Sequence, residues 1–519
     1  MTNNKYGAPE GRSAMILRTL GEFRANDAPT HGGRIFSYVY DSGLAELDLL
    51  AAEAGRVMQS VNGLDPTTYP SVARLEKEIV DFAKHIFHAD AAADIADDDT
   101  RVFGSITSGG TASCLLAVKT ARDLWKERGG TGVPKILAPV TVHAAFHKAA
   151  EYFGLDLLLV PVDPVSKEVS SADIIAKMAE DIAIVVLSAP NYPYGLIDPI
   201  AEVAPHAARH GISFHVDACF GGFVLPWWPG KTGSWDFSVP GVTSLSADIH
   251  KFGYAPKGSS VLLQRGRHRH RTQYFATKNW PGYPVVNSTL VGSKPASPLA
   301  AAWAIVSYLG EGGFDNLTQK IVRACDKLAA VFEHDVLGLK LAAHSFGPVV
   351  TIEVDESVPE VDRVDPHHFS DALNKHFSWT SQAQPGYVQT DGTYLHPTVH
   401  FTLTPVSLTV MPQLKADILA AADLVRGIPK VTLKQVSAGL PEGILDILSN
   451  GKSLSTEEIT SFFALLGLGE AVDAKQVYSE ARGSSTLPSG QAVLMALIEE
   501  LPSTLVEQML IEVIARQLE

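Results

Sequence analysis

The sequence predicts an α/β protein with a mostly parallel β-sheet, and three observations lead to this fold class. Between residues 70 and 310, apolar runs of strand length alternate with segments of helical periodicity. The runs are apolar along their whole length, as expected where helices cover both faces of a parallel sheet. With 519 residues, 46% of them hydrophobic, the chain is long enough for two or three domains with a substantial core.

The expected elements of this region follow from local patterns. The first sixty residues mix glycine, arginine and tyrosine with a helical stretch at 44–61, which indicates an arm and a lead-in helix. Apolar residues recur with helical spacing over 72–87, so a helix is expected there. Strands are expected at four apolar runs, namely 135–140, 155–162, 183–190 and 212–218.

Beyond residue 310 the pattern changes. A helical segment starting at Asn316 leads into two strand candidates, at 348–354 and 398–406, and the last ninety residues are helical and amphipathic, notably at 457–469 and 491–518. We therefore predict four parts in chain order: an N-terminal arm and lead-in helix at 1–60, a large ligand-binding domain at 61–310, a small α+β domain at 311–430 and a helical C-terminal extension at 431–519.

Charge and cysteine content exclude several classes of protein. Lysine and arginine number 42 against 57 aspartates and glutamates, and the net charge of −15 opposes binding to nucleic-acid phosphates. The three cysteines, Cys114, Cys219 and Cys325, lie far apart with neither metal-ligand spacing nor an even-numbered disulfide framework. No run approaches the ~18 apolar residues of a membrane span, and the N-terminus lacks a signal-peptide core. We expect a soluble cytoplasmic protein without a metal site.

Glycines and hydroxyl residues lie where a phosphate could bind. TSGGTAS, at 107–113, follows a short strand-like segment and precedes a helical pattern. Free N–H groups and the positive end of the dipole at a helix N-terminus attract an anion, and glycine lets the anion approach the backbone. The motif alone is weak evidence, because Gly-Gly-Thr also caps ordinary helices.

Other candidate residues lie at strand ends. His143 follows one expected strand, Ala189 ends another and Asp217 ends a third, strongly apolar one. A carboxylate there needs a cation, a protonated ring nitrogen or a helix N-terminus as its partner. Lys251, in SADIHKFGYAPKGSS, has apolar neighbours that would desolvate its amine, although a single lysine can also extend its amine to water. Together these residues are the parts that hold pyridoxal phosphate (PLP), with Lys251 bound to the cofactor as a Schiff base.

The motifs also resemble a known family. Six motifs, in the order in which they follow one another along the chain, are similar to motifs of the group II PLP-dependent decarboxylase superfamily, and most closely to the sphingosine-1-phosphate lyases. They are TSGGTAS, VHAAFHKAAEYFG, SAPNYPYGLIDPI, FHVDACFGGF, SADIHKFGYAPKGSSVLL and WPGYPVVNSTLVGSKP. The resemblance covers roughly residues 30 to 430. It implies the fold-type I PLP-dependent transferase fold, with PLP in the large domain.

The resemblance implies roles for individual residues around the cofactor. Lys251 would carry it, His143 would stack on its ring, Ala189 would back the other face, and Asp217 would pair with its ring nitrogen; the catalytic residues would be Lys251, His143 and Asp217. Further contacts, to the cofactor phosphate, are expected from Gly110, Thr111, His250, Gly292 and Ser293.

The resemblance also implies a homodimer and a substrate site. Gly292 and Ser293 resemble a loop that reaches the phosphate from the neighbouring subunit, so the active sites would lie at the subunit interface. Lys257 and Tyr40 match residues that in the lyases help to hold the substrate's phosphate, and Asn62 lies in a motif with a related task.

The chain departs from the lyase motifs at several positions. Asp65 replaces a histidine that helps to grip the substrate phosphate, and a carboxylate there would repel a phosphate and attract an ammonium. Lys294 replaces an arginine and loses its bidentate geometry. Val285 replaces a tyrosine and Ala112 a glutamate. These departures leave PLP well supported but weaken the case for a sphingoid phosphate substrate.

Three functions follow from the sequence. The first is a carbon–carbon lyase that cleaves a 2-amino-3-hydroxy substrate to an aldehyde and an amine, favoured because Lys257 and Tyr40 remain. The alternative is an amino-acid decarboxylase, which also takes a small-molecule amine or amino acid. A minor alternative is a non-catalytic protein of the same fold that acts through its C-terminal helices. The basic run RGRHRHR, at 265–271, is interpreted as a solvated loop in preference to an anion or metal site.

Overall fold

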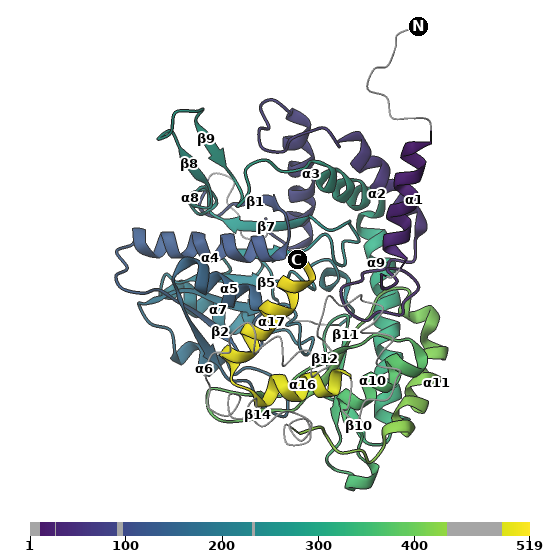
Figure 1. The fold of residues 1–519 in the computed structure, drawn as a ribbon. Coiled ribbons are helices and arrows are strands. Elements are labelled where there is room, and N and C mark those ends of the chain that lie inside the picture. Colours follow the sequence, from purple (N-terminus) through teal and green to yellow (C-terminus); the bar gives the residue numbers. More distant parts are fainter. Residues whose placement is uncertain (1–10, 26, 91–96, 231–233, 433–489, 519) are drawn as a thin grey trace. The chain divides into compact units, whose positions relative to one another are not determined.

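The computed structural model describes residues 11–25, 27–90, 97–230, 234–432 and 490–518 (Figure 1). Residues 31–428 form one compact unit, and the described residues outside this range belong to a second unit. The predicted division of the chain at residues 60, 310 and 430 stays a prediction.

The larger unit is built on a seven-stranded sheet with the order β1-β7-β6-β5-β4-β2-β3. Strand β7 is antiparallel to both of its neighbours, and every other pairing in the sheet is parallel. The strands are β1 (Val102–Thr107), β2 (Lys135–Pro139), β3 (Asp156–Val160), β4 (Ile182–Ser188), β5 (Ser213–Asp217), β6 (Ser244–Ala247) and β7 (Ser260–Arg265). The four strands expected from apolar runs are therefore present as β2 to β5, shorter than expected by one to three residues.

Helices cover both faces of this sheet (Figure 1). Successive side chains of β4 point to opposite faces, so Ile184 belongs to a core formed with α4 and α5, while Val185 belongs to the main core on the other side. The helices next to the strands are α3 (Pro70–Ile86), α4 (Gly110–Glu127), α5 (Ala144–Phe153), α6 (Ser171–Ala176) and α7 (Ile200–Arg209). The predicted α/β class with helices on both faces of a mostly parallel sheet is confirmed.

The lead-in helices and the long helix that follows the sheet pack together. Helix α2 (Ala45–Val57) and α3 both contact α9 (Ser297–His334). Helix α3 begins at Pro70, where proline suits the first turn because its missing N–H would have no partner. Helix α9 is interrupted at Gly310, whose φ of 52° lies in the left-handed region that glycine tolerates.

A smaller antiparallel sheet follows α9, as the sequence predicts. Its order is β10-β11-β15-β12, and α10 (Pro366–Phe377) and α11 (Ser407–Val425) pack with this part of the chain. Its strands are β10 (Leu339–Leu341), β11 (Val349–Val354), β12 (Gln382–Gln384) and β15 (Thr398–Thr402); two short hairpins are formed by β8 (Phe275–Thr277) with β9 (Val285–Asn287) and by β13 (Tyr387–Val388) with β14 (Tyr394–Leu395).

The interpretation of RGRHRHR as a solvated loop is wrong. Its first arginine ends β7, and the run continues as the short helix α8 (Arg267–Thr272). Arg269 donates to Ser213 Oγ at 3.0 Å, and the His270 ring stacks on Phe103 with a 5.8 Å separation of ring centroids. The basic residues are thus packed against the end of the sheet, because aliphatic and ring parts of such side chains can be buried while their polar atoms find partners.

In the second unit, the described elements are three helices. They are α1 (Arg12–Arg24), α16 (Gln491–Glu500) and α17 (Ser503–Leu518). The helical segment predicted at 457–469 lies outside the described residues. Among the helices that the structure describes, none combines the length and the apolar character needed to cross a membrane.

Candidate active site

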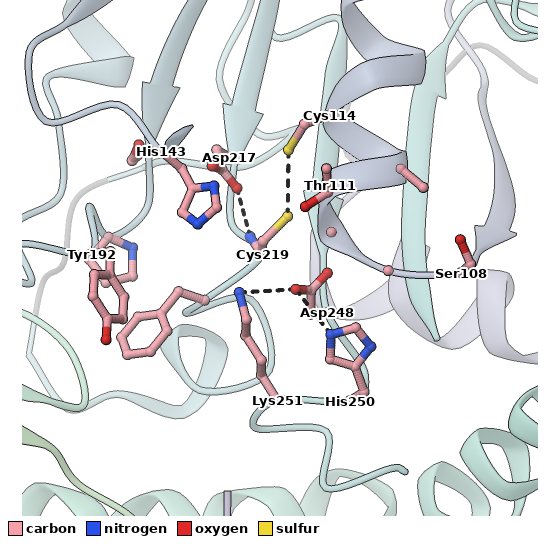
Figure 2. A pocket seen from close by; sticks show the side chains of 16 residues that line it. Ser108, Thr111, Cys114, His143, Tyr192, Asp217, Cys219, Asp248, His250 and Lys251 are labelled. Atoms are coloured by element: carbon pink, nitrogen blue, oxygen red, sulfur yellow. Dashed lines mark hydrogen bonds and ion pairs between the residues drawn. The ribbon is translucent and has the colours of Figure 1, made fainter. Parts of the chain in front are cut away.

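A cavity of about 420 Å³ opens at the carboxyl edge of the large sheet, where the loops after the strands converge (Figure 2). Five of the seven strands, β1, β2, β4, β5 and β6, lead into it, and their ends and the segments that follow them supply its wall. The lining residues are Ser108, Gly109, Gly110, Thr111, Ala112, Cys114, His143, Ser188, Pro190, Tyr192, Asp217, Cys219, Phe220, Asp248, His250 and Lys251. Six residues predicted to bind the cofactor, Gly110, Thr111, His143, Asp217, His250 and Lys251, are therefore brought together.

The N-terminus of α4 forms one side of the cavity. Gly110 begins the helix, and a Cβ atom added there would lie 2.5 Å from Asp248 Oδ2, so no larger residue fits without displacing the carboxylate. The other oxygen of Asp248, Oδ1, is buried without a hydrogen-bond partner among the described residues. An unpartnered buried oxygen beside free helix N–H groups marks a place for a polar ligand.

Lys251 points into the cavity from the loop after β6. Its Nζ lies 3.0 Å from Asp248 Oδ2, and His250 Nε2 lies 3.5 Å from the same oxygen (Figure 2). Burial alone would lower the pKa of Lys251, but the charge of the Asp248 carboxylate outweighs it and raises the pKa above its ordinary value. The amine is therefore held as an ammonium ion paired with a buried carboxylate.

Asp217 ends β5 and lies on the opposite wall of the cavity. It is 6% exposed, and its Oδ1 accepts the backbone N–H of Cys219 at 3.0 Å. The thiol of Cys219 lies 3.9 Å from that of Cys114, which comes from α4. The contact with Cys114 and then burial raise the pKa of the Cys219 thiol. For Cys114 the same contact lowers the pKa, but burial and the nearby carboxylates outweigh it, so the pKa of this thiol is also raised.

His143 caps the N-terminus of α5 at the edge of the cavity. Its Nδ1 accepts the backbone N–H of Ala145 at 3.1 Å, which leaves Nε2 to carry the proton of the neutral ring. The ring is open to the cavity, yet the surrounding protein displaces water and lowers the pKa of His143. His143 is therefore a neutral ring that can stack on a ligand or donate one hydrogen bond.

Aromatic side chains close another side of the cavity. The Tyr192 ring stacks on His400 with centroids 4.3 Å apart, and burial raises the pKa of its phenol to about 12. Behind them, the Tyr40 ring lies 5.1 Å from that of Phe252, and Lys257 Nζ lies 4.5 Å above Tyr40. Tyr40 and Lys257, both predicted to bind substrate, thus lie next to each other, although neither lines the cavity itself.

The remaining predicted residues also lie outside the cavity wall. Ala189 is fully buried between two lining residues, and its peptide bond to Pro190 is cis. Asn62 Nδ2 donates to Ser293 Oγ at 3.2 Å, which places the loop of Gly292 beside that of Asn62. Asp65 is in a turn where it accepts hydrogen bonds from Thr67 and Thr68, and these lower the pKa of its carboxyl to about 2.

Sequence reasoning missed several residues of the cavity. Asp248 lies three residues before Lys251 in the same motif, and the argument that singled out Asp217, a carboxylate at the end of an apolar strand, applies to it equally. Tyr192 lies in SAPNYPYG, from which only Ala189 was selected. Cys114 and Cys219 are 105 positions apart, and no sequence signal places them together.

The side chains present fit PLP. A lysine amine, a buried carboxylate on the opposite wall and a helix N-terminus that requires glycine share one cavity, and these groups match the cofactor's aldehyde, ring nitrogen and phosphate. A neutral histidine ring at the cavity's edge provides a stacking surface.

Comparisons with known proteins agree with this geometry. Residues 33–343 match the family described as the pyridoxal-dependent decarboxylase conserved domain. The chain is 38% identical over 309 residues to a sphingosine-1-phosphate lyase of Dictyostelium discoideum, a match that covers 59% of this chain and 56% of the relative. It is 38% identical over 329 residues to one of Arabidopsis thaliana, covering 62% of this chain and 58% of the relative.

A solved structure is also similar. A sphingosine-1-phosphate lyase of Burkholderia pseudomallei superposes with a TM-score of 0.72 and 28% sequence identity, covering 86% of this chain and 96% of the other. The matches to the two eukaryotic relatives span only a little more than half of those proteins.

Proposed function

The chain belongs to the pyridoxal-dependent decarboxylase family, and from this premise we propose that it is a PLP-dependent carbon–carbon lyase that cleaves a 2-amino-3-hydroxy substrate to an aldehyde and an amine. The cofactor is PLP. The observation that carries the proposal is the single cavity in which Lys251, Asp217 and the N-terminus of α4 converge. The names of the similar proteins in Dictyostelium, Arabidopsis and Burkholderia support a lyase over other reactions of the family.

The cofactor supplies the electron sink that weakens bonds at the substrate's α-carbon. Lys251 would attach it covalently, Asp217 would pair with its ring nitrogen, and Gly110, Thr111 and His250 would hold its phosphate. When neutral and not bound to the cofactor, the amine of Lys251 would lie beside Asp248, whose carboxylate makes it a stronger base. Lys251 Nζ is thus suited to accept the proton of the substrate's 3-hydroxyl, as cleavage of the adjacent carbon–carbon bond requires.

Two other groups at the cavity can act as hydrogen-bond donors. His143 is neutral with its remaining proton on Nε2, and Tyr192 keeps its phenol proton because its pKa is about 12. Neither is suited to removing a proton at neutral pH. Both can donate hydrogen bonds to a substrate carboxylate, hydroxyl or departing carbonyl oxygen, and so fix which bond at the α-carbon is broken.

An amino-acid decarboxylase is the second candidate. The negative charge of Asp65 favours it over a lyase that acts on a phosphorylated substrate. The carboxyl of Asp65 is ionised because its pKa is about 2, and a negative charge there disfavours a phosphorylated substrate. In that reaction the ammonium of Lys251, held beside Asp248, would be the positioned acid that returns a proton to the α-carbon after the loss of carbon dioxide.

One experiment separates the two reactions. The full-length enzyme loaded with PLP is incubated with amino acids, 3-hydroxy amino acids and phosphorylated long-chain amines, and aldehyde and carbon dioxide are measured separately. Aldehyde without carbon dioxide supports the lyase. Carbon dioxide alone would replace it with the decarboxylase, and neither product from any member of the panel would support the non-catalytic alternative.

We also propose a homodimer whose active sites lie at the subunit interface. The predicted phosphate-binding loop of Gly292 and Ser293 lies outside the cavity of its own chain, beside Asn62. The neighbouring hairpin β8–β9 projects from the sheet (Figure 1) and exposes apolar side chains of a kind that interfaces bury. These are Phe275, Trp280, Tyr283 and Val286, which are 46% to 62% exposed.

The predicted cytoplasmic location remains part of this proposal. It is supported by the low cysteine content, three residues in 519, and by the free state of these three thiols in the structure.

A further inference from the structure

Two thiols and a carboxylate meet on the wall of the active-site cavity. Cys114 is held in α4, and Cys219 lies in the turn after β5, where its backbone N–H donates to Asp217 Oδ1 at 3.0 Å. Their sulfur atoms lie 3.9 Å apart, and an oxygen of Asp217 joins them with all three atoms within 4.8 Å of one another. The three residues are buried and all line the cavity.

This spacing matches the ligand set of a tetrahedral thiolate metal site. Two sulfurs that are each about 2.3 Å from a tetrahedral zinc ion lie about 3.8 Å apart, close to the separation observed. A carboxylate oxygen completes a set of three protein ligands, and the cavity leaves the fourth position to water. We propose that Cys114, Cys219 and Asp217 form a binding site for a soft divalent cation of the zinc and cadmium class.

The chemistry of the ligands selects this class of metal. Thiolate sulfur favours zinc, cadmium and related ions, whereas magnesium and calcium require oxygen ligands that this site lacks. Both cysteines are free thiols in the structure, so binding one divalent cation as two thiolates releases two protons, and with Asp217 bound as a carboxylate the site has a net charge of −1. The reaction needs no oxidant.

The site should exclude the cofactor. Asp217 is the carboxylate proposed to pair with the ring nitrogen of PLP, and one carboxylate on this wall cannot serve a metal ion and the ring at once. The metal is thus an inhibitor that occupies the cofactor-free enzyme. Metal binding itself does not depend on the proposed function, and only the competition rests on the proposed role of Asp217.

Cadmium is the probe, because thiolate coordination gives an ultraviolet charge-transfer band. The full-length chain, freed of PLP and kept under a phosphine reductant, is titrated with Cd²⁺, and the same titration is made on the PLP-loaded enzyme. We expect one equivalent to produce the band in the cofactor-free chain, Zn²⁺ to remove it by competition, and PLP loading to prevent it. The chain has only three cysteines, all buried, so no surface thiol contributes to the signal.

Three serine variants locate the site. Replacing even an outer-shell partner costs about 10–100-fold in metal affinity, so Cys114→Ser and Cys219→Ser should each weaken Cd²⁺ binding at least that much. Cys325→Ser is the matched control, since this buried thiol contacts the Gly347 carbonyl and not the cluster. Alanine variants of Cys114 and Cys219, with circular dichroism of each protein, separate loss of a ligand from loss of the fold.

The metal site, its carboxylate ligand and the competition with PLP are each tested by a separate result. No band in the cofactor-free chain, or an unchanged band in a folded Cys114 or Cys219 variant, would overturn the metal site. Unchanged Cd²⁺ affinity in Asp217→Asn would remove the carboxylate from the ligand set. A full band on the loaded enzyme, with the PLP absorbance undiminished, would overturn the competition while leaving the activity measurements on the loaded enzyme untouched.

Discussion

The amine of Lys251 lies 3.0 Å from Oδ2 of Asp248, a carboxylate that is 2% exposed and comes from the same loop after β6. This pairing fixes the charge of the residue proposed to attach the cofactor. Attachment requires the unprotonated amine, whereas the carboxylate holds the proton on it. Asp248 therefore controls both how readily the cofactor is attached and how well the freed amine later carries a proton.

We predict that Asp248→Asn speeds attachment of PLP to the cofactor-free enzyme at neutral pH. Without the carboxylate, burial dominates and the pKa of Lys251 falls, and each unit of that fall raises the fraction of free amine about tenfold. Stopped-flow absorbance after addition of PLP measures the rate across pH. Asp236→Asn is the control, because Asp236 is equally buried but pairs with His88. A rate profile identical to wild type would contradict this role of Asp248.

The pair of Lys251 and Asp248 should also make the stability of the cofactor-free protein depend on pH. The folded-state pKa of Lys251 is raised, so the ion pair stabilises the folded, cofactor-free protein. This contribution to the free energy of unfolding is fully present below the ordinary lysine pKa of about 10.4, and it is lost as pH rises through the folded-state pKa. At neutral pH the Asp248→Asn protein should therefore unfold at a lower temperature than wild type. The difference should shrink in strongly alkaline buffer.

Lys251→Ala should abolish turnover while preserving the fold. Loss of a covalent catalytic group commonly costs several orders of magnitude, so we expect less than about 1% of the wild-type rate and no lysine-bound cofactor absorbance. Lys148→Ala is the control, since this exposed lysine on α5 contacts the ring of Tyr152. Multiple turnovers above that level in a folded Lys251→Ala protein would remove Lys251 from its proposed role.

Asp217→Asn should retain PLP but lose most activity. The amide oxygen can still accept the Cys219 N–H, so the loop after β5 keeps its geometry, but a neutral amide does not hold a proton on the ring nitrogen. We expect kcat to fall by at least about a hundredfold with the cofactor still bound. Cofactor content by absorbance and kcat are measured on the same preparation, and an unchanged kcat would exclude the pairing.

The sequence predicted most of the fold because its patterns are local. The apolar runs that became β2 to β5 and the helical spacing of α3 depend on neighbouring residues alone. Residues at strand ends, such as His143 and Asp217, were found because parallel strands bring their carboxyl ends to one edge. The contact of Cys114 with Cys219 and the partners that hold Arg269 depend on residues far away in the chain, so no local pattern reports them.

The apolar β8–β9 hairpin gives a test of the proposed dimer. Placing charges on its exposed face with the double variant Phe275→Glu, Val286→Lys should convert dimer to monomer in sedimentation experiments and lower activity in parallel. Val165→Lys is the control, because this valine is 80% exposed in a turn before α6. A wild-type enzyme that sediments as a monomer with full activity would contradict the interface.

Lys257 should make the binding of a phosphorylated substrate depend on pH. The protein around its amine displaces water and, together with Lys251, lowers the pKa of Lys257 to about 8. The KM for such a substrate should therefore rise as pH increases through 8, and Lys257→Met should raise KM at pH 7 and remove this dependence. The amine of Lys257 also donates to the His250 carbonyl at 3.0 Å, so cofactor content is measured alongside KM.

Asp65 and Lys257 together should report the charge of the natural substrate. Asp65 is partly exposed and ionised, and a charge pair at a partly screened distance is worth ~1–4 kcal/mol, or roughly tenfold or more in affinity. If Asp65 faces the partner's cavity in the proposed dimer, Asp65→His should tighten binding of sphingosine phosphate, which we expect the native enzyme to cleave poorly. For an uncharged substrate or one with a distal amine, the same change should weaken binding or leave it unaltered. Efficient native cleavage of sphingosine phosphate, undiminished in Lys257→Met, would show that neither charge reaches the substrate, because two opposite charges in the pocket cannot both be without effect on a phosphate.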